Sequence, residues 1–503
     1  MLSLLPLPTT SKNLIARILT VVTNALIGNI DGVTMKFCIL GPVTLLASVV
    51  LSTTSCRTSN SDNDSTLLDN TTGISAPFAS GDATDAKWAI RFNFPECDHQ
   101  GQKKGAWCES TNATASTKKN GVEDHLRAWI ENPKIKVIKM AYFSFSNKTV
   151  VEMLCDAAIG RGLKAVLYIH GQSIVDNVNT LKNCSPQNIQ VIERGTTFGT
   201  NDGYLQHAKI FLASEVDVTK PLADLQGQDA LDLEASTLYI ASSSANMSSF
   251  GTSLHFENWM FLDAKANSQV AQTNLCFFKA IEDMTGTDRD SFALIYKDCR
   301  EKITAAKNDE IVFYPVPHGK INPEAYKEML DLIKNSTVSI KVGIHRLTAS
   351  GVFKALAERA TKIPVNVILD DDILRTGVKN GGKALDVGAN DVQAYRTVRD
   401  AGASVVFMET NADTTTHLFH NKFMVFDEKV LFAGAGNFTA TSLNTFNNGN
   451  IEHFYIIRKP EIVKAYSEAF AKLQALATPA AQHAVGANVE RGVKCNGLCE
   501  FTD

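Results

Sequence analysis

The stretch HNKFMVFDEKVLFAGAGN, residues 420–437, holds the features that decide the fold of this chain. His420 and Lys422 open a short apolar run, and in a β-strand residues i and i+2 project from the same face. Asp427 suits the tight connection to a second apolar run. The small residues before Asn437 let the backbone turn there. The stretch therefore predicts two strands, one presenting His and Lys on a single face and the next ending at an Asn amide.

A second copy of this arrangement lies about two hundred residues earlier. His207-Ala208-Lys209 opens an apolar run, and Ser243-Ser244-Ala245-Asn246 follows the next one. Further along come His255-Phe256-Glu257 in the first half and Asn450-Ile451-Glu452 in the second. One His-x-Lys occurs by chance, whereas two copies, each followed by a strand, a small-residue turn, an Asn and a Glu, form a strong constellation.

The duplication extends outward from these motifs. Each half carries, in order, a helical segment, a β-branched strand, an amphipathic helix and a second strand. The first series is 124–132, 135–145, 150–162 and 164–170, and the second is 324–335, 338–347, 351–362 and 364–370. Such units build mixed sheets covered by helices. We expect an α/β fold made of a duplicated domain, with repeats at 85–308 and 309–503 and the site at their junction.

These motifs resemble those of the phospholipase D superfamily, whose pattern is His-x-Lys-x4-Asp followed by Gly-Ser/Gly-x-Asn. The second half matches at His420, Lys422, Asp427, Gly434 and Asn437. The first half matches at His207, Lys209 and Asn246, but has Ser214 in place of Asp and Ser243 in place of Gly. The connection from Ser214 to Ser236 is a long insertion, so a tight-turn Asp has no equivalent role there. Tyrosyl-DNA phosphodiesterases also lack this Asp, and the departure does not exclude activity.

The resemblance implies two histidines that face each other across one pocket. One attacks phosphorus and forms a phosphohistidine, and the other protonates the leaving oxygen and then activates water. Two lysines and two asparagines stabilise the phosphate oxygens, so no metal or cofactor is expected. The usual assignment in the superfamily makes the histidine of the first half, His207, the nucleophile. The poorer match of the first motif to the family pattern favours His420 instead. The residues expected at the site are His207, Lys209, Asn246, His420, Lys422 and Asn437 for catalysis, Glu257, Glu452 and Asp427 in support, and Ser244, His255 and Gly436 for substrate.

Two further polar groups leave alternatives open. Asp370-Asp371-Asp372 ends a predicted strand and fits either a cation site or the beginning of a solvated loop. His345-Arg346 fits either a phosphate contact or a structural role.

The N-terminus predicts export. Met35-Lys36 precedes an apolar run, 37–51, and a small-residue stretch that ends at Cys56. This describes a signal segment, 35–56, with Cys56 as a lipoprotein-type acylation site, although an ordinary signal peptidase site nearby competes with it. Residues 1–34 make little sense before a signal, and 57–84 read as a solvated tether. We expect an exported bacterial protein, either secreted, periplasmic or anchored to the outer membrane through Cys56.

The cysteines agree with export. Outside the signal segment the chain has eight, which form four near-neighbour pairs in chain order: Cys97 and Cys108, Cys155 and Cys184, Cys276 and Cys299, Cys495 and Cys499. An even count in an exported chain predicts disulfides.

Composition limits the functional classes. The chain has 503 residues, 44% hydrophobic and 20% charged, with a net charge of −4. This is globular composition, and bulk charge does not favour tight nucleic-acid binding. We expect a phosphodiesterase of phospholipase D type acting on phospholipid. The alternatives are a nuclease of the same superfamily, a phosphatidyl transferase and a non-catalytic phosphate-binding protein. Because both halves are present, a monomer suffices for a complete site.

Overall fold

The computed structural model describes residues 87–94, 96–97, 113–114, 121–171, 176–196, 204–316, 324–373, 390–410, 418–445, 449–479 and 481–482. The predicted N-terminal extension, the signal, Cys56 and the tether lie outside these residues. The proposed repeat limits at 308 and 309 stay a prediction. Among the described residues, no helix is both long and apolar enough to cross a bilayer.

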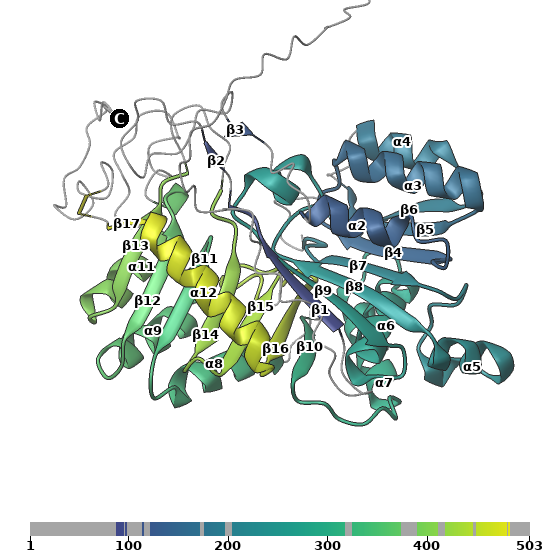
Figure 1. Ribbon diagram of the computed structural model, residues 1–503. Helices are drawn as coiled ribbons and strands as arrows, with labels where there is room; N and C mark the ends of the chain where they lie inside the picture. The colour runs from purple at the N-terminus through teal and green to yellow at the C-terminus, as the bar shows by residue number, and fades with distance from the viewer. Residues whose placement is uncertain are drawn as a thin grey trace, which may run out of the picture. The chain divides into compact units, whose positions relative to one another are not determined.

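The first sheet has seven strands, with three parallel strands at one edge (Figure 1). The parallel strands are β4, β5 and β6, and the remaining neighbours are antiparallel. In spatial order the strands are β1 (Lys87–Phe92), β9 (Asn258–Lys265), β8 (Thr237–Ser243), β7 (Lys209–Ser214), β4 (Val137–Tyr142), β5 (Lys164–His170) and β6 (Ile189–Arg194).

The second sheet repeats this order strand for strand and adds one short strand at its edge. In spatial order its strands are β10 (Ile311–Val316), β16 (Glu452–Ile457), β15 (Val430–Gly434), β14 (Lys422–Phe426), β11 (Ile340–Ile344), β12 (Val365–Asp370), β13 (Ser404–Met408) and β17 (Thr478–Pro479). A separate two-stranded pair is formed by β2 (Glu96–Cys97) and β3 (Ala113–Thr114). The predicted α/β fold with two mixed sheets from a duplicated domain is confirmed.

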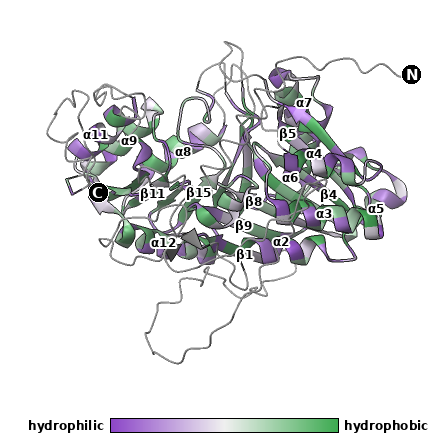
Figure 2. Cartoon of the chain, turned by 90° about the horizontal axis from the view of Figure 1, so that it is seen from above, coloured by the Kyte–Doolittle hydropathy of each residue, from purple (hydrophilic) through white to green (hydrophobic). Residues whose placement is uncertain are grey.

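Each sheet packs one face against helices of its own half. The first sheet packs against α2 (Val122–Ile130), α3 (Lys148–Arg161) and α4 (Asp176–Cys184), and the second against α8 (Glu324–Asn335), α9 (Ser350–Ala360) and α11 (Asn390–Asp400). Strands of both sheets are mostly hydrophobic, whereas α3 and α11 carry hydrophilic residues along one side (Figure 2). Local signals bound these helices: the Asn147 side chain accepts a hydrogen bond from Val150 N at the start of α3, and Gly162 ends it in the left-handed conformation.

A third core joins the two halves. It combines residues of both sheets with three helices, α6 (Gln269–Asp283), α7 (Arg289–Glu301) and α12 (Pro460–Leu476). Helix α12 contacts β1 of the first half, and α6 contacts β10 of the second. The first-half insertion forms η2 (Leu222–Asp224) and α5 (Gly227–Ala235) between β7 and β8, and a π-helical turn, η3 (Phe250–Leu254), precedes β9.

Two of the predicted disulfides are present. Cys155–Cys184 joins α3 to α4, and Cys276–Cys299 joins α6 to α7. The side chains of the other two predicted pairs lie outside the described residues.

Candidate active site

The two His-x-Lys motifs lie at equivalent strand ends. Lys209 is the first residue of β7 and Lys422 the first of β14, with each histidine two residues before. Contacts between the halves fix both segments, since His207 N donates to Ile451 O at 2.9 Å and His420 N donates to Phe256 O at 2.9 Å. The histidine of each half is thereby held beside the segment that carries the glutamate of the other half.

The histidine–glutamate pairs cross between the halves. His207 Nδ1 lies 2.8 Å from Glu452 Oε1 and 2.9 Å from Oε2, and His420 Nδ1 lies 2.8 Å from Glu257 Oε1. The glutamates are buried, while 12% of the His207 side chain and 10% of the His420 side chain remain exposed. Because a carboxylate faces Nδ1 of each ring, Nε2 is the nitrogen left for chemistry.

The lysines are buried beside their own histidines. Lys209 Nζ donates to His207 O at 2.8 Å and lies 3.1 Å from His207 Nε2, and Lys422 Nζ donates to His420 O at 2.7 Å. Burial lowers the pKa of Lys209 to about 8 and that of Lys422 to about 7, although the two glutamates oppose this. A bound anion would recover part of this desolvation cost.

Burial also affects the pKa values of the two histidines. It lowers the pKa of both His207 and His420, although each neighbouring glutamate acts in the opposite direction. Burial alone would raise the pKa of Glu257, but His420, hydrogen bonds from His255 and His420, and the Lys422 charge together hold it far below its ordinary value. The unliganded site therefore favours neutral imidazoles next to ionised Glu257.

The two predicted asparagines lie at matching turns. Asn246 follows β8 and Asn437 follows β15, and the residue after each pairs with the segment following β4 or β11. Within the described residues, neither Oδ1 has a hydrogen-bond partner although both are buried. Their predicted role as donors to phosphate stays a prediction.

The three residues predicted to touch substrate lie against the glutamates. The Ser244 hydroxyl is fully buried and donates to Glu257 Oε2 at 2.5 Å. His255 Nδ1 lies 3.7 Å from Glu257 Oε1. A Cβ on Gly436 would lie 2.6 Å from Phe454 and 3.3 Å from the Glu452 carboxyl carbon. The geometry favours an orienting role for Ser244 and a packing role for Gly436 over direct substrate contact.

Asp427 is a structural residue in this geometry. Its carboxylate accepts backbone hydrogen bonds from Thr337, Val338 and Ser339, at 2.8–3.1 Å. It lies in the tight connection between β14 and β15, at the far end of β14 from Lys422. In the first half the Ser214 hydroxyl accepts only the Val216 N–H, at 3.2 Å, among the described contacts.

Sequence reasoning missed the residues that follow each glutamate. Asn258 Oδ1 accepts the backbone N–H of Lys422 at 3.3 Å, and His453 Nδ1 lies 3.5 Å from the backbone nitrogen of Lys209. His453 is fully buried, its Nε2 lies 2.8 Å from Ser242 Oγ, and burial holds its pKa far below the ordinary value. The available signal was a polar residue in an otherwise apolar strand directly after a motif glutamate.

Near His420, three potential metal ligands converge. His345, Asp370 and Asp372 each offer one ligand atom, and these atoms lie within 4.8 Å of one another. Two carboxylates and an imidazole suit a divalent transition metal. Asp370 is already engaged, however, because its carboxylate accepts hydrogen bonds from Phe419 N, Thr410 Oγ1 and Asp372 N. The two alternatives that the sequence left for this segment therefore stay open.

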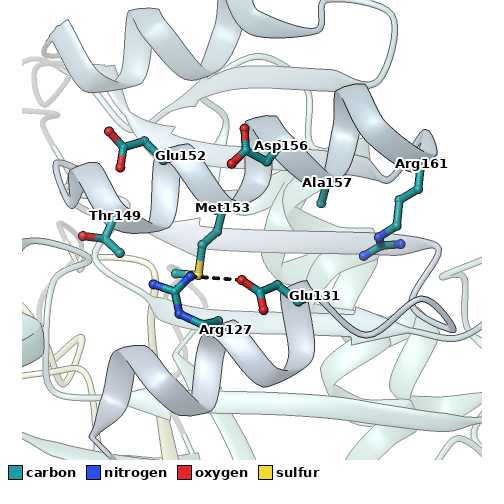
Figure 3. A pocket seen from close by; sticks show the side chains of 8 residues that line it. All are labelled: Arg127, Glu131, Thr149, Glu152, Met153, Asp156, Ala157 and Arg161. Carbon is teal, nitrogen blue, oxygen red and sulfur yellow. Dashed lines mark hydrogen bonds and ion pairs between the residues drawn. The ribbon is translucent and has the colours of Figure 1, made fainter. Parts of the chain in front are cut away.

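A cavity of about 350 Å³ lies away from these residues, between α2 and α3. Figure 3 shows acidic and basic side chains of the two helices around it, with Arg127 and Glu131 paired at 3.0 Å. No residue of the predicted site lines it. Its lining residues are Arg127, Glu131, Thr149, Glu152, Met153, Asp156, Ala157 and Arg161.

Residues 329–474 match the family model described as "Cardiolipin synthase, PLD-like domain". No curated protein matches the chain. Similar solved structures include a polyphosphate kinase from Porphyromonas gingivalis, with 12% identity and a TM-score of 0.43 over 70% of this chain and 48% of that one. They also include a phosphatidylserine synthase from Haemophilus influenzae Rd KW20, with 11% identity and a TM-score of 0.44 over 73% and 90%. A third is the phospholipase D family member Nuc from Salmonella typhimurium, with 16% identity and a TM-score of 0.26 over 34% and 96%.

Proposed function

Because the chain belongs to the phospholipase D superfamily, we propose that it is a phosphodiesterase that cleaves phospholipids through a phosphohistidine intermediate. The observation that carries the proposal is the crossed pair of histidine–glutamate contacts, each with a buried lysine beside it. A structural protein would gain little from two buried lysines with lowered pKa next to two histidines, since buried charges without a ligand cost stability.

The contacts favour His207 as the nucleophile. Its Nδ1 faces Glu452, and Lys209 Nζ lies 3.1 Å from its Nε2. A protonated lysine can donate to Nε2 only when that nitrogen carries a lone pair. This tautomer is the nucleophilic one.

The reaction then proceeds in two steps. His207 Nε2 forms a bond to phosphorus while the bond to the leaving oxygen breaks, and His420, which the bound anionic phosphodiester keeps protonated, delivers its proton to that oxygen. Glu452 stabilises the positive charge that develops on His207. Water then attacks the phosphohistidine, His420 removes its proton, and His207 leaves. Lys209 and Lys422 neutralise the non-bridging oxygens throughout, which is the charge stabilisation that a metal supplies in other phosphodiesterases.

The proposal includes the cellular location of the protein. We propose export through the segment 35–56, with lipidated Cys56 as a membrane anchor and a monomer as the active unit. Such a location would place phospholipid within reach of the site. Mass spectrometry of the mature N-terminus tests the proposed export and lipidation independently of activity.

The decisive assay measures hydrolysis of two substrate classes in parallel, with EDTA present. One is vesicles of phosphatidylcholine and phosphatidylethanolamine, and the other is single-stranded and double-stranded DNA. We expect head-group release that the variant His420→Ala loses. Cleavage of DNA with intact lipids would assign the chain to the nucleases. If neither substrate reacts and no phosphate is trapped on a histidine, the protein is a phosphate-binding receptor and the proposal is wrong.

A further inference from the structure

The backbone N–H group that begins each lysine strand is bound by a side chain of the other half. The pairing of β7 with β8 begins one residue after Lys209, and that of β14 with β15 begins one residue after Lys422. The N–H of Lys209 donates to His453 Nδ1 at 3.5 Å, and the N–H of Lys422 donates to Asn258 Oδ1 at 3.3 Å. All four residues are buried. Because a buried N–H group needs a partner, these contacts fix each lysine strand at its first residue.

Each of these side chains directly follows a motif glutamate. In β16, Glu452 contacts the ring of His207, and the next residue, His453, binds the backbone of Lys209. The corresponding two residues of the first half do the same for the second motif. Two consecutive residues therefore hold both the histidine and the lysine of the opposite motif, so that the two catalytic groups keep a fixed relative position.

The hydrogen bonds of His453 define its tautomer. Burial holds the pKa of His453 far below its ordinary value, and the charges of Lys209 and His207 act in the same direction. A neutral imidazole has one donor and one acceptor nitrogen. Because the Lys209 N–H can only donate, Nδ1 is the acceptor, and Nε2 carries the hydrogen that it donates to Ser242 Oγ at 2.8 Å. The Ser242 hydroxyl thus favours the tautomer that can bind the Lys209 backbone.

The second half achieves the same contact with different side chains. Asn258 Nδ2 donates to the Tyr466 hydroxyl of α12 at 3.2 Å, while Asn258 Oδ1 accepts the backbone N–H of the lysine. The position that corresponds to Ser242 is Ala433, which has no hydroxyl. An amide carries a donor and an acceptor in fixed places, so it needs no hydroxyl to select a tautomer. An asparagine at position 453 should therefore preserve the contact that the histidine makes.

We infer that His453 is a positioning residue that acts through Lys209, and that Ser242 holds His453 in the tautomer which accepts the Lys209 N–H. The inference rests on the proposed function, in which Lys209 Nζ neutralises a phosphate oxygen beside His207. Lys209 Nζ lies 3.1 Å from His207 Nε2, and a backbone shift of about 1 Å at a catalytic group can lower a rate by about 10²-fold. The loss of His453 should therefore lower the rate of phosphoryl transfer.

The test measures kcat/KM for a soluble p-nitrophenyl phosphodiester, per molecule of folded protein. We expect His453→Leu, which removes the acceptor, to lower kcat/KM by about 10–100-fold. His453→Asn, which copies Asn258, should stay within about threefold of wild type, because its amide oxygen can accept the same N–H. Ser242→Ala should lower kcat/KM in the same direction as His453→Leu, but less. His125→Leu, at a histidine of α2 that packs on Phe261, is the matched control and should leave kcat/KM unchanged.

A double-mutant cycle distinguishes a positioning role from a purely structural one. If His453 acts through the lysine side chain, His453→Leu should change kcat/KM by no more than about twofold in the variant Lys209→Ala, which lacks that side chain. A structural defect would lower kcat/KM by the same factor in both backgrounds.

The outcomes separate this inference from the proposed function. The inference is overturned if His453→Leu keeps the wild-type kcat/KM, if it loses equally in both backgrounds, or if His453→Asn loses as much as His453→Leu. Melting temperatures identify any loss of folding, and if His453→Leu does not fold, the same cycle with Ser242→Ala decides. The ester contains neither lipid nor nucleic acid, so a nuclease activity would not affect the test. If wild type does not hydrolyse the ester, the proposed function fails, and the inference fails with it.

Discussion

At the scale of single residues, the two lysines of the site are ammonium groups that burial destabilises in their charged form. Each ammonium group is buried, and its pKa is lowered to about 8 in Lys209 and about 7 in Lys422. An anionic phosphodiester needs both in the charged form. As pH rises through this range the lysines lose their protons, so kcat/KM should fall on the alkaline side. On the acidic side, the lowered pKa of His207 extends the range in which the proposed nucleophile is neutral to a pH below the ordinary histidine pKa.

The pH profile of kcat/KM for the variant Lys422→Arg tests this assignment. A guanidinium stays charged at every accessible pH, so of the two lysines only Lys209 would still lose its proton on the alkaline side. We expect the alkaline midpoint to move from about 7 toward about 8, together with a lower maximal rate from the changed donor geometry. Lys429→Arg, in the exposed turn after β14, serves as the matched control. An alkaline limb that does not move in Lys422→Arg would show that another group controls it.

Much of the residue set could be predicted from sequence because the motif repeats. The His, Lys, Asn and Glu residues recur at matching places, and repetition distinguishes them from chance. Residues that occur in one half only carry no such signal, and His345 stands where the other half has Phe143. Ser244 was expected to contact substrate, but its side chain is buried against Glu257. A side chain's direction in a turn depends on packing that spacing alone does not give.

At the scale of elements, Asp427 links the β14–β15 turn to the start of β11. Asp427 and Glu428 both have positive φ values, 53° and 57°, and the Asp427 carboxylate accepts three backbone N–H groups from residues 337–339. Burial is the largest single influence on the pKa of Asp427 and raises it, but the hydrogen bonds from residues 337–339 together outweigh burial and lower the pKa overall. The resulting stability is therefore fully present above the ordinary pKa of an aspartate and is lost as pH falls through the lowered one.

Replacement of Asp427 should reduce stability rather than chemistry. We expect Asp427→Asn to lower the free energy of unfolding at pH 7 by about 0.5–1.5 kcal/mol, because a charged acceptor is lost from three backbone N–H groups that are largely exposed to solvent. The rate per folded molecule should persist, since the five residues of β14 place Lys422 about 17 Å away. Urea unfolding at pH 7 and pH 3 measures the first effect, and the difference from wild type should shrink at pH 3. Ser214→Ala is the control in the other half, and an equal loss there would contradict the account.

Elements with strong periodicity agree closely with expectation, and those without it do not. The strand expected at 164–170 is β5 and the helix expected at 324–335 is α8, both with the predicted limits. The strand β1, at 87–92, was not predicted, and it pairs with β9 from 170 residues later in the chain. The central helices α6 and α12 were also missed, because helices buried in a shared core lack a clean polar stripe.

At the scale of the whole molecule, each half supplies the glutamate that contacts the histidine of the other half. The glutamate of the first half, Glu257, contacts His420, and Glu452 of the second contacts His207. The sequence predicted a supporting role for these glutamates but could not assign a histidine to each of them. That assignment depends on how the halves pack through α6, α12 and the shared core, which no local pattern records.

The crossed pairing can be tested through the leaving group. A p-nitrophenyl ester needs no protonation to depart, whereas an alkyl ester does. We expect Glu257→Gln, like His420→Ala, to lower kcat/KM for alkyl phosphodiesters by roughly 10²–10⁴ while its effect on p-nitrophenyl phosphodiesters stays within about tenfold. Glu452→Gln, like His207→Ala, should reduce both substrates alike, because it acts on the nucleophile.

A positioning glutamate must share the substrate dependence of the histidine that it holds. If the pairs formed within halves, Glu257→Gln would instead follow His207→Ala and lower both esters equally. The comparison needs only the ratio of the two substrates within each variant, so a general loss of folded protein cancels from it. Equal ratios for Glu257→Gln and Glu452→Gln would show that the glutamates act on the site as a whole, and the division of roles between His207 and His420 would then have to be abandoned.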